Sequence, residues 1–316
     1  MKRCLFICWF LIYVTTLTAQ QPGQYYNYQW QPVAVDKALF YSTTDFLGEL
    51  YYRRNYYIRE DKMQMDGFYK DEDCKVKQGL FYYYYPGGNI EKICSYDKNK
   101  LAGRYISFHQ NGAMKDSAYY IKGHIMGNAY SWYPDGMVKD SIEIYKDGSG
   151  ASVSWHPNGQ PAAGGYYAAA GKLRGTWQYF HFNGKPASRE KYEKGILAGI
   201  QYFDEQGNEE KDTTNTDRAV SFPGGEKEWT KYVTGYAIIP AGWENIKTGD
   251  ISVVVSAVID QDGRVQDAYV SSPFHPAFDK IALNILQSSP SWLPAIEHHR
   301  KIQKEVRLPI TFSSPR

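Results

Sequence analysis

A glycine recurs at a nearly constant interval through the middle of the sequence, and each time it opens a similar phrase of about ten residues. The phrases begin at Gly79, Gly103, Gly127, Gly150, Gly175 and Gly199, with spacings of 24, 24, 23, 25 and 24 residues. A fixed period in this range indicates a stack of repeated supersecondary units that bury their apolar faces against one another. We therefore expect an elongated array, an architecture suited to binding or spacing more than to catalysis.

Each repeat is predicted to be a β-hairpin. The first half of a repeat alternates between apolar and polar residues and ends at Asn111-Gly112, Asp135-Gly136, Asn158-Gly159 or Asn183-Gly184. Such pairs accept the positive φ angles of tight turns. The second half returns through a tyrosine eight residues after the turn glycine, at Tyr96, Tyr120, Tyr167 and Tyr192. With one irregular earlier unit, the array is predicted to span residues 51–207, after a lead-in at 20–50.

Period-two alternation assigns two columns of residues to opposite faces of the array. One column holds Phe108, Trp132, Trp155 and Phe180, flanked by Ile106, Tyr130 and Val153, and is predicted to be the buried core. The other column holds Tyr85, His109, Tyr133, His156 and His181, which we expect to be exposed stacking or hydrogen-bonding residues. Equivalent positions in successive two-stranded repeats lie roughly 10 Å apart, which is too far for a shared metal ion. No metal or cofactor site is predicted.

These phrases resemble bacterial variants of the MORN repeat over about half of the chain. The resemblance implies a long meander of β-hairpins. For function it implies a scaffold or a membrane-associated module. The expected fold is therefore mainly β, with a MORN-like array in the middle of the chain.

The N-terminus has the pattern of a secretory signal peptide at residues 1–19. Lys2 and Arg3 precede an apolar run of about 13 residues, and Ala19 fits a small-residue cleavage site. The alternative is an uncleaved anchor, although the run is shorter than the roughly 20 residues of a spanning helix. Loss of Lys2 and Arg3 leaves a neutral chain, which has no broad field to attract nucleic acid or anionic lipid.

Two cysteines, Cys74 and Cys94, lie outside the predicted signal peptide. An exported protein meets an oxidising setting, in which one disulfide between them is one outcome and two free thiols are the other.

After a polar linker at 208–221, residues 222–316 predict a small α+β domain. The turn and short helix of FPGGEKEW come first, followed by a strand at Ile251–Ile259 and its return at Arg264–Ser271. Pro276 opens a helix that runs to Gln287, because Pro is favoured in the first turn. A final strand covers residues 302–312. The resulting β-β-α-β order is typical of a helix packed on an antiparallel sheet.

Ordered motifs in this region, namely FPGGEKEW, DGRV, FDKIALNIL, SPSWLPA and RLPITF, resemble the C-terminal domain of TonB-type energy transducers over residues 222–312. The resemblance implies a periplasmic domain that binds the extended TonB box of outer-membrane receptors by strand addition at an exposed edge. Carried over to this sequence, that edge comprises Lys304, Glu305, Val306, Arg307, Leu308, Ile310 and Thr311. Unlike a transducer, the chain has an N-terminal segment that is predicted to be cleaved, and the array stands where a Pro-rich spacer would be expected.

No catalytic pattern stands out, and the chain is not expected to be an enzyme. Residues 170–173 have part of a phosphate-loop pattern but lack its earlier glycine and its Ser or Thr, and no G-x-S-x-G elbow occurs. His298-His299-Arg300-Lys301 is interpreted as a charged turn. The predicted function is an exported interaction protein of the periplasm or outer envelope that binds an outer-membrane receptor or another envelope partner. The alternatives are an inner-membrane-anchored transducer and a MORN-type lipid-associated scaffold.

Overall fold

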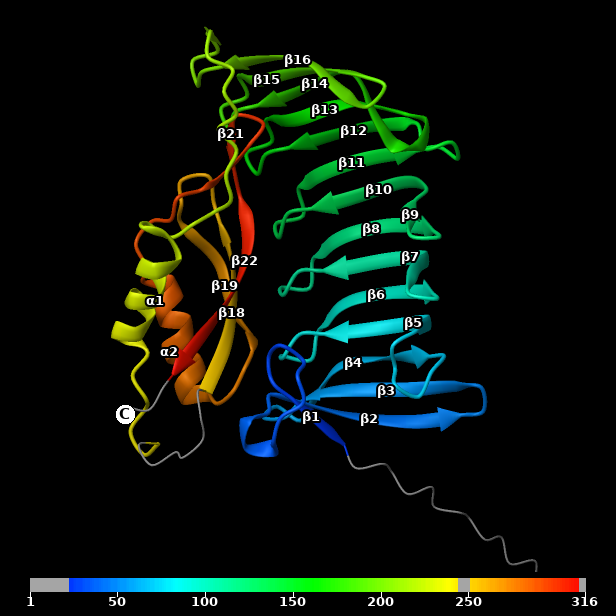
Figure 1. Cartoon of the computed structure of the whole chain (residues 1–316), viewed down its shortest axis with the longest axis vertical. Coiled ribbons are helices and arrows are strands. Elements are labelled where there is room, and N and C mark those ends of the chain that lie inside the picture. Colours follow the sequence, from blue (N-terminus) through cyan, green and yellow to red (C-terminus); the bar gives the residue numbers. More distant parts are fainter. Residues whose placement is uncertain (1–22, 244–250, 313–316) are drawn as a thin grey trace, which may run out of the picture.

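A long curved sheet and a smaller α/β unit lie side by side in the computed structural model, which describes residues 23–243 and 251–312 (Figure 1). The predicted signal peptide falls outside the described residues. The two helices cover the side of the small unit that faces away from the long sheet, so the open face of the small sheet is turned toward the long one (Figure 1). Within the described ranges no helix has the length and apolar character that crossing a membrane requires.

The long sheet is one antiparallel meander, which confirms the predicted fold class. Its strands are β1 Gln24–Tyr26, β2 Phe40–Leu47, β3 Leu50–Tyr57, β4 Lys62–Tyr69, β5 Lys77–Tyr84, β6 Ile90–Asp97, β7 Lys100–Phe108, β8 Met114–Ile121, β9 His124–Ile125, β10 Gly127–Trp132, β11 Val138–Ile144, β12 Gly150–Trp155, β13 Pro161–Ala168, β14 Lys172–Phe180, β15 Pro186–Glu193, β16 Ile196–Phe203 and β17 Glu209–Glu210. Short 3-10 turns cover Val35–Lys37 and Ala169–Gly171. Each strand pairs with its sequence neighbour, except that β8 pairs with both β9 and β10.

The Asx-Gly turns differ in type from the expected one. In the turn after β10, the N–H of Gly136 donates to the carbonyl of Tyr133 at 2.9 Å, and Gly136 has φ 88°. Asp135 keeps a negative φ, and its carboxylate accepts from the N–H of Met137 at 3.0 Å. This is a turn with a single left-handed glycine, a bulge-type hairpin. Turns with two positive φ angles lie at the other end of the hairpins, as at Lys122-Gly123.

The bulge beside each of these turns overturns the predicted core column. Pairing shifts by one residue just before Phe108, Trp132, Trp155 and Phe180. A bulge re-aims the side chain that follows it, so simple alternation fails there. Those four residues are only half-buried, and Tyr130 and Val153 are 38% and 43% exposed. The buried apolar clusters of the array are instead formed by Met65, Tyr69, Phe81 and Cys94 in its first half and by Ala163, Trp177 and Tyr179 in its second.

The second predicted column forms a ladder of hydrogen bonds between repeats. Tyr85, Tyr133, His156 and His181 are buried and His109 is half-buried, so the expectation that they are exposed is wrong. Their hydrogen bonding is confirmed: each side chain donates to a backbone carbonyl of the next repeat, at 2.8 to 3.0 Å, the acceptors being Phe108, Trp132, Trp155, Phe180 and Phe203. Because a carbonyl only accepts, the three imidazoles carry their proton on Nε2.

The smaller unit matches the predicted order and adds a hairpin. Its elements are α1 Gly225–Tyr236, β18 Ile251–Ile259, β19 Val265–Ser272, α2 Pro276–Gln287, β20 Ala295–Glu297, β21 Arg300–Ile302 and β22 Lys304–Phe312. The sheet order is β19-β18-β22, and β20 pairs with β21 separately. Helix α2 starts at Pro276, where the ring nitrogen Nδ1 of His275 accepts from the N–H of Ala277. Its buried face packs on the valines of β18.

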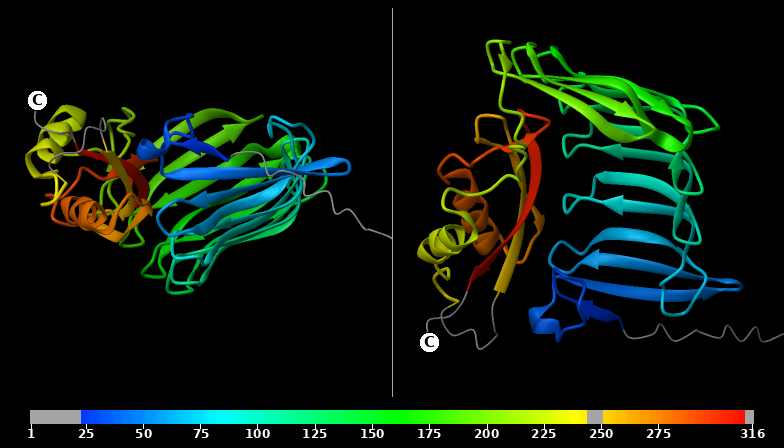
Figure 2. Two further views of the ribbon diagram at one scale, coloured as in Figure 1. Left: turned by 90° about the horizontal axis from the view of Figure 1, so that it is seen from below. Right: turned by 45° about the horizontal axis from the view of Figure 1, so that its top comes forward.

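The two units share an apolar core at the N-terminal end of the array. Leu39, Phe40 and Tyr57 belong to the same buried cluster as Phe278 and the other core residues of the smaller unit. The views in Figure 2 show the smaller unit beside the array in both orientations. The smaller unit is therefore packed on the array by side chains from both.

Candidate functional site

Strand β22, which contains every residue of the predicted partner-binding edge, is an edge strand of the small sheet. It pairs with β18 over nine consecutive residue pairs, from Ile251↔Phe312 to Ile259↔Lys304, without a bulge. In the part of the chain that the structure describes, no strand pairs with its other side. One row of its backbone groups is therefore free to pair with an added strand.

Pro309 tells which backbone groups of β22 point outward. Pro309 lies opposite Val254 in the ladder, and proline has no N–H to donate. A regular antiparallel ladder can include it only where its nitrogen faces away from β18. In a regular antiparallel ladder the backbone groups of successive residues point alternately toward the partner strand and away from it. The N–H groups of Glu305, Arg307 and Thr311 therefore also point to the open edge, together with the carbonyls of these three residues and of Pro309.

The side chains of the predicted edge divide between the two faces of the sheet. Val306, Leu308 and Ile310 belong to the core beneath the helices. The others are on the open face or at the strand end, and each has a partner: Lys304 pairs with Glu297 at 2.6 Å, Glu305 with Lys115 at 3.0 Å, Arg307 donates to Ser272 Oγ at 3.1 Å, and Thr311 bonds Ser252 at 3.0 Å. Recognition at this edge therefore depends on backbone groups and on the open face.

A cleft separates the open face of the small sheet from the array. A cavity of about 590 Å³ lies between Trp132 and His109 of the array and Tyr269, Gln303 and Glu305 of the small unit. A second cavity of about 480 Å³ adjoins it beside β22. This volume is in the range of ordinary ligand pockets. The cleft has room for side chains of a segment that pairs with β22.

Ionisable groups in the second cavity are shifted by burial. Burial raises the pKa of the Glu91 carboxyl, an effect that the cations Lys92 and Lys115 oppose. Burial also raises the pKa of Tyr269 to about 12, assisted by Glu305 and Glu91, and its ring contacts Tyr85 edge to face with centroids 5.8 Å apart. Carboxylates and tyrosine rings make this part of the cleft favourable for a cationic side chain.

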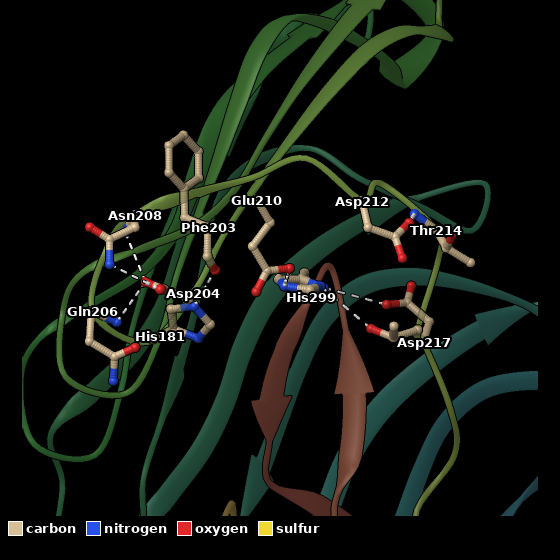
Figure 3. A network of polar contacts seen from close by, with 11 residues as sticks. His181, Phe203, Asp204, Gln206, Asn208, Glu210, Asp212, Thr214, Asp217 and His299 are labelled. Carbon is tan, nitrogen blue, oxygen red and sulfur yellow. Dashed lines mark hydrogen bonds and ion pairs between the residues drawn. The ribbon is translucent and has the colours of Figure 1, made fainter.

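The turn of the β20–β21 hairpin makes a contact that sequence reasoning missed. The sequence predicts only a charged turn there, and the structure shows that turn seated against the last repeats of the array (Figure 3). His298 stacks on Tyr179, and His299 stacks on Tyr202. No local signal indicates the contact, because His-His lacks the Asn or Gly of a common two-residue turn.

Cys74 and Cys94 are both free thiols in the structure and belong to one cluster. Cys94 is buried, whereas the Cys74 sulfur lies 3.9 Å from the hydroxyl of Thr44. The disulfide stays an untested prediction. Among the described residues no group of His, Cys, Asp or Glu is arranged to hold a metal ion.

Comparison with known proteins finds a match within the smaller unit. Residues 250–314 match the family model of the Gram-negative bacterial TonB protein C-terminal domain. The match covers β18, β19, α2 and β22, the elements that build the open edge. No curated protein matches the chain. The resemblance is thereby confirmed for residues 250–314, and it implies either a role in protein interaction in the cell envelope or a TonB-type role.

Proposed function

We propose that this chain is an exported interaction protein of the cell envelope. In this proposal β22 takes up an extended segment of an outer-membrane receptor, or of another envelope partner, as an added strand. The open edge of β22, within a segment that matches the TonB C-terminal family, is the observation that carries it. The array, which we propose to be MORN-type, holds this edge and forms the other wall of the cleft.

The backbone of β22 supplies a modest part of the affinity. Strand addition over residues 305–311 would use three N–H groups and four carbonyls, each worth about 1 kcal/mol net. Ordering a flexible seven-residue segment costs on the order of 1–2 kcal/mol per residue, which offsets all of this gain. Net affinity must therefore come from partner side chains that enter the cleft, whose carboxylates and rings favour a basic residue.

A proline substitution tests the outward backbone donors. Arg307→Pro removes one outward N–H and leaves the ladder to β18 intact, as Pro309 already does two residues away. Arg307→Ala is the matched control, because it removes the same side chain and its bond to Ser272 but keeps the N–H. Binding of a seven-residue TonB-box peptide to the full mature chain is measured by calorimetry. We expect Arg307→Pro to bind about fivefold more weakly than Arg307→Ala.

Two results would contradict the proposal. One is a mature chain that binds no extended receptor peptide at all. The other is equal binding by the proline and alanine variants when circular dichroism shows that both are folded. N-terminal sequencing of the protein purified from envelopes tests export separately: a start at Gln20 supports cleavage, and an intact Met1 would favour the inner-membrane anchor.

A further inference from the structure

The turn of the β20–β21 hairpin contacts two adjacent sites on the array. We call these sites the Tyr179 slot and the Tyr202 slot, after the tyrosine ring at each. His298 and His299 form the turn with φ angles of 54° and 63°, which directs both rings toward the array. The ring of His298 lies flat on Tyr179, with centroids 3.8 Å apart and planes 7° apart. The ring of His299 lies on Tyr202 in the same way, at 4.4 Å and 8°. Each histidine ring thus stacks on a tyrosine ring of its own.

Each slot also has a carboxylate. Nδ1 of His298 lies 2.7 Å from Glu190. Nε2 of His299 lies 3.1 Å from Glu210 (Figure 3). Burial acts to raise the pKa of Glu190, but hydrogen bonds from His298, Tyr192 and Ser188 outweigh it and hold the pKa below its usual value. Glu190 is therefore an anion whenever the histidine is protonated.

The surroundings of His299 include further polar groups. The backbone N–H of His299 donates to Asp217 at 3.5 Å, and Nδ1 lies 3.5 Å from the hydroxyl of Thr216. The ring of His181 lies 6.4 Å away, and its own Nε2–H is used on the carbonyl of Phe203. Glu210 and Asp217 thus both face His299.

The next two residues complete the contact in different ways. Lys301 pairs with Glu205 at 3.1 Å on the surface. Arg300 donates to the carbonyl of Ala162 at 2.5 Å and lies over the ring of Tyr179 at 5.3 Å, and its Nε is buried without a partner in the described part of the chain. Burial lowers the pKa of Arg300, a sign that its charge is poorly compensated. A buried cation without a carboxylate partner weakens a contact.

The two ends of the interface between the units therefore differ in chemistry. At the N-terminal end, Leu39, Phe40 and Tyr57 share an apolar core with the small unit. At the other end the contact consists of histidine, arginine and glutamate side chains on tyrosine rings. Polar contacts of this kind are typical of interfaces between domains that move.

We propose that the His298–Lys301 turn is a reversible, pH-dependent latch. When it leaves the Tyr179 and Tyr202 slots, the small unit swings away about the shared apolar core and opens the cleft beside β22. Release of the latch is independent of the proposed function, whereas its consequence for partner binding rests on that function.

The expected pH dependence follows from the charges. A protonated imidazole pairs with Glu190 or Glu210 by charge as well as by hydrogen bond, and a neutral one by hydrogen bond alone. Histidine ordinarily titrates near pH 6.5. The latch is therefore expected to be tighter at pH 6 and looser at pH 8.

A zero-length cross-link between Lys115 and Glu305 reports closure of the cleft. The two side chains belong to different units and pair at 3.0 Å, and neither is part of the His298–Lys301 turn. Carbodiimide coupling of the full mature chain followed by mass spectrometry gives the yield of this amide. The Lys304–Glu297 pair, at 2.6 Å within the small unit, is the internal standard because opening does not separate it.

Variants of opposite effect make the test decisive. The double variant His298→Ala with His299→Ala is expected to lower the normalised Lys115–Glu305 yield by at least about threefold, and so is a change from pH 6 to pH 8. Arg300→Met removes the poorly compensated buried charge and is expected to keep the yield high at pH 8. Unchanged yields in the double variant and across pH, with the internal standard intact, would overturn the latch.

The peptide assay separates the latch from the proposed function. If the latch gates β22, the double variant binds the TonB-box peptide more tightly than the parent chain does. A lower cross-link yield with unchanged peptide affinity would overturn gating but keep the latch. Binding of no peptide by any variant would contradict the proposed function and leave the cross-link result standing.

Discussion

Replacing Gly165 by alanine is expected to destabilise the array, because the ring of Trp177 lies directly on this glycine. Gly165 is in β13 and Trp177 is in the adjacent strand β14, where it is 6% exposed. A Cβ built on Gly165 would lie 2.2 Å from Cδ2 of the indole. The ring would have to move by more than 1 Å to restore an ordinary contact, which would also disturb the bond from its Nε1 to the carbonyl of Tyr166 at 3.1 Å.

The neighbouring glycine supplies a matched control. A Cβ on Gly164 would meet only the carbonyl oxygen of Ser152, at an ordinary 3.5 Å, and neither glycine has a positive φ. Gly164→Ala should therefore be neutral or stabilise by up to about 1 kcal/mol, through reduced freedom of the unfolded chain. Overpacking costs about 1–3 kcal/mol, so Gly165→Ala should lower the free energy of unfolding by roughly that amount.

Urea unfolding of the protein, followed by circular dichroism and tryptophan fluorescence, measures both variants. The midpoint for Gly165→Ala should fall below that of the parent, and the midpoint for Gly164→Ala should not. Equal midpoints for the two variants would refute the packing argument. Gly67 provides an independent repeat of the test, because its added Cβ would lie 2.2 Å from Cδ1 of the fully buried Phe81.

Three further changes have defined outcomes. Tyr133→Phe leaves the carbonyl of Trp155 without its donor, so urea unfolding should show a loss of about 1 kcal/mol. Burial raises the pKa of Glu91 in the folded state, so the ionised carboxylate destabilises the folded chain and the protonated carboxyl does not. Glu91→Gln should therefore stabilise the chain at pH 7, and this gain should disappear as the pH falls below 4.5. Burial also raises the pKa of both thiols, and Cys94 is the more buried, so iodoacetamide at pH 8 should modify Cys74 faster; no reaction at either before reduction would instead support the disulfide.

The sequence predicts the strands and helices well because each has a strong local cause. The period of about 24 residues requires stacked hairpins, and Pro276 with the apolar spacing after it places α2 at its observed bounds. The predicted faces of the array are wrong. Period-two counting assumes a regular ladder, whereas a shift of one residue precedes Trp132 and its equivalents. A bulge leaves little trace in a single sequence beyond the glycine of the turn.

The candidate site is predictable in part. The position of β22 follows from the TonB resemblance, and the direction of its free N–H groups can be derived from Pro309 once the register is known. The latch could not be predicted, because it joins His298 to Glu190, which is 108 residues away in the sequence. The Pro290-to-Pro294 segment before it indicates only the end of a helix. Contacts between residues so far apart in the sequence depend on how the two units pack together, and no local sequence pattern encodes that packing.

The packing of the two units changes the expected role of the array. A simple spacer would leave the C-terminal unit beyond the last repeat, but the chain turns back after β17 and the unit lies along the array (Figure 2). Array residues such as Trp132 then line the same cavity as Glu305 of β22. If the array contributes to recognition, Trp132→Ala should weaken peptide binding although it leaves every backbone group of β22 in place. A true spacer would show no such effect, so this single variant, compared with the surface variant Tyr166→Ala, decides between the two roles.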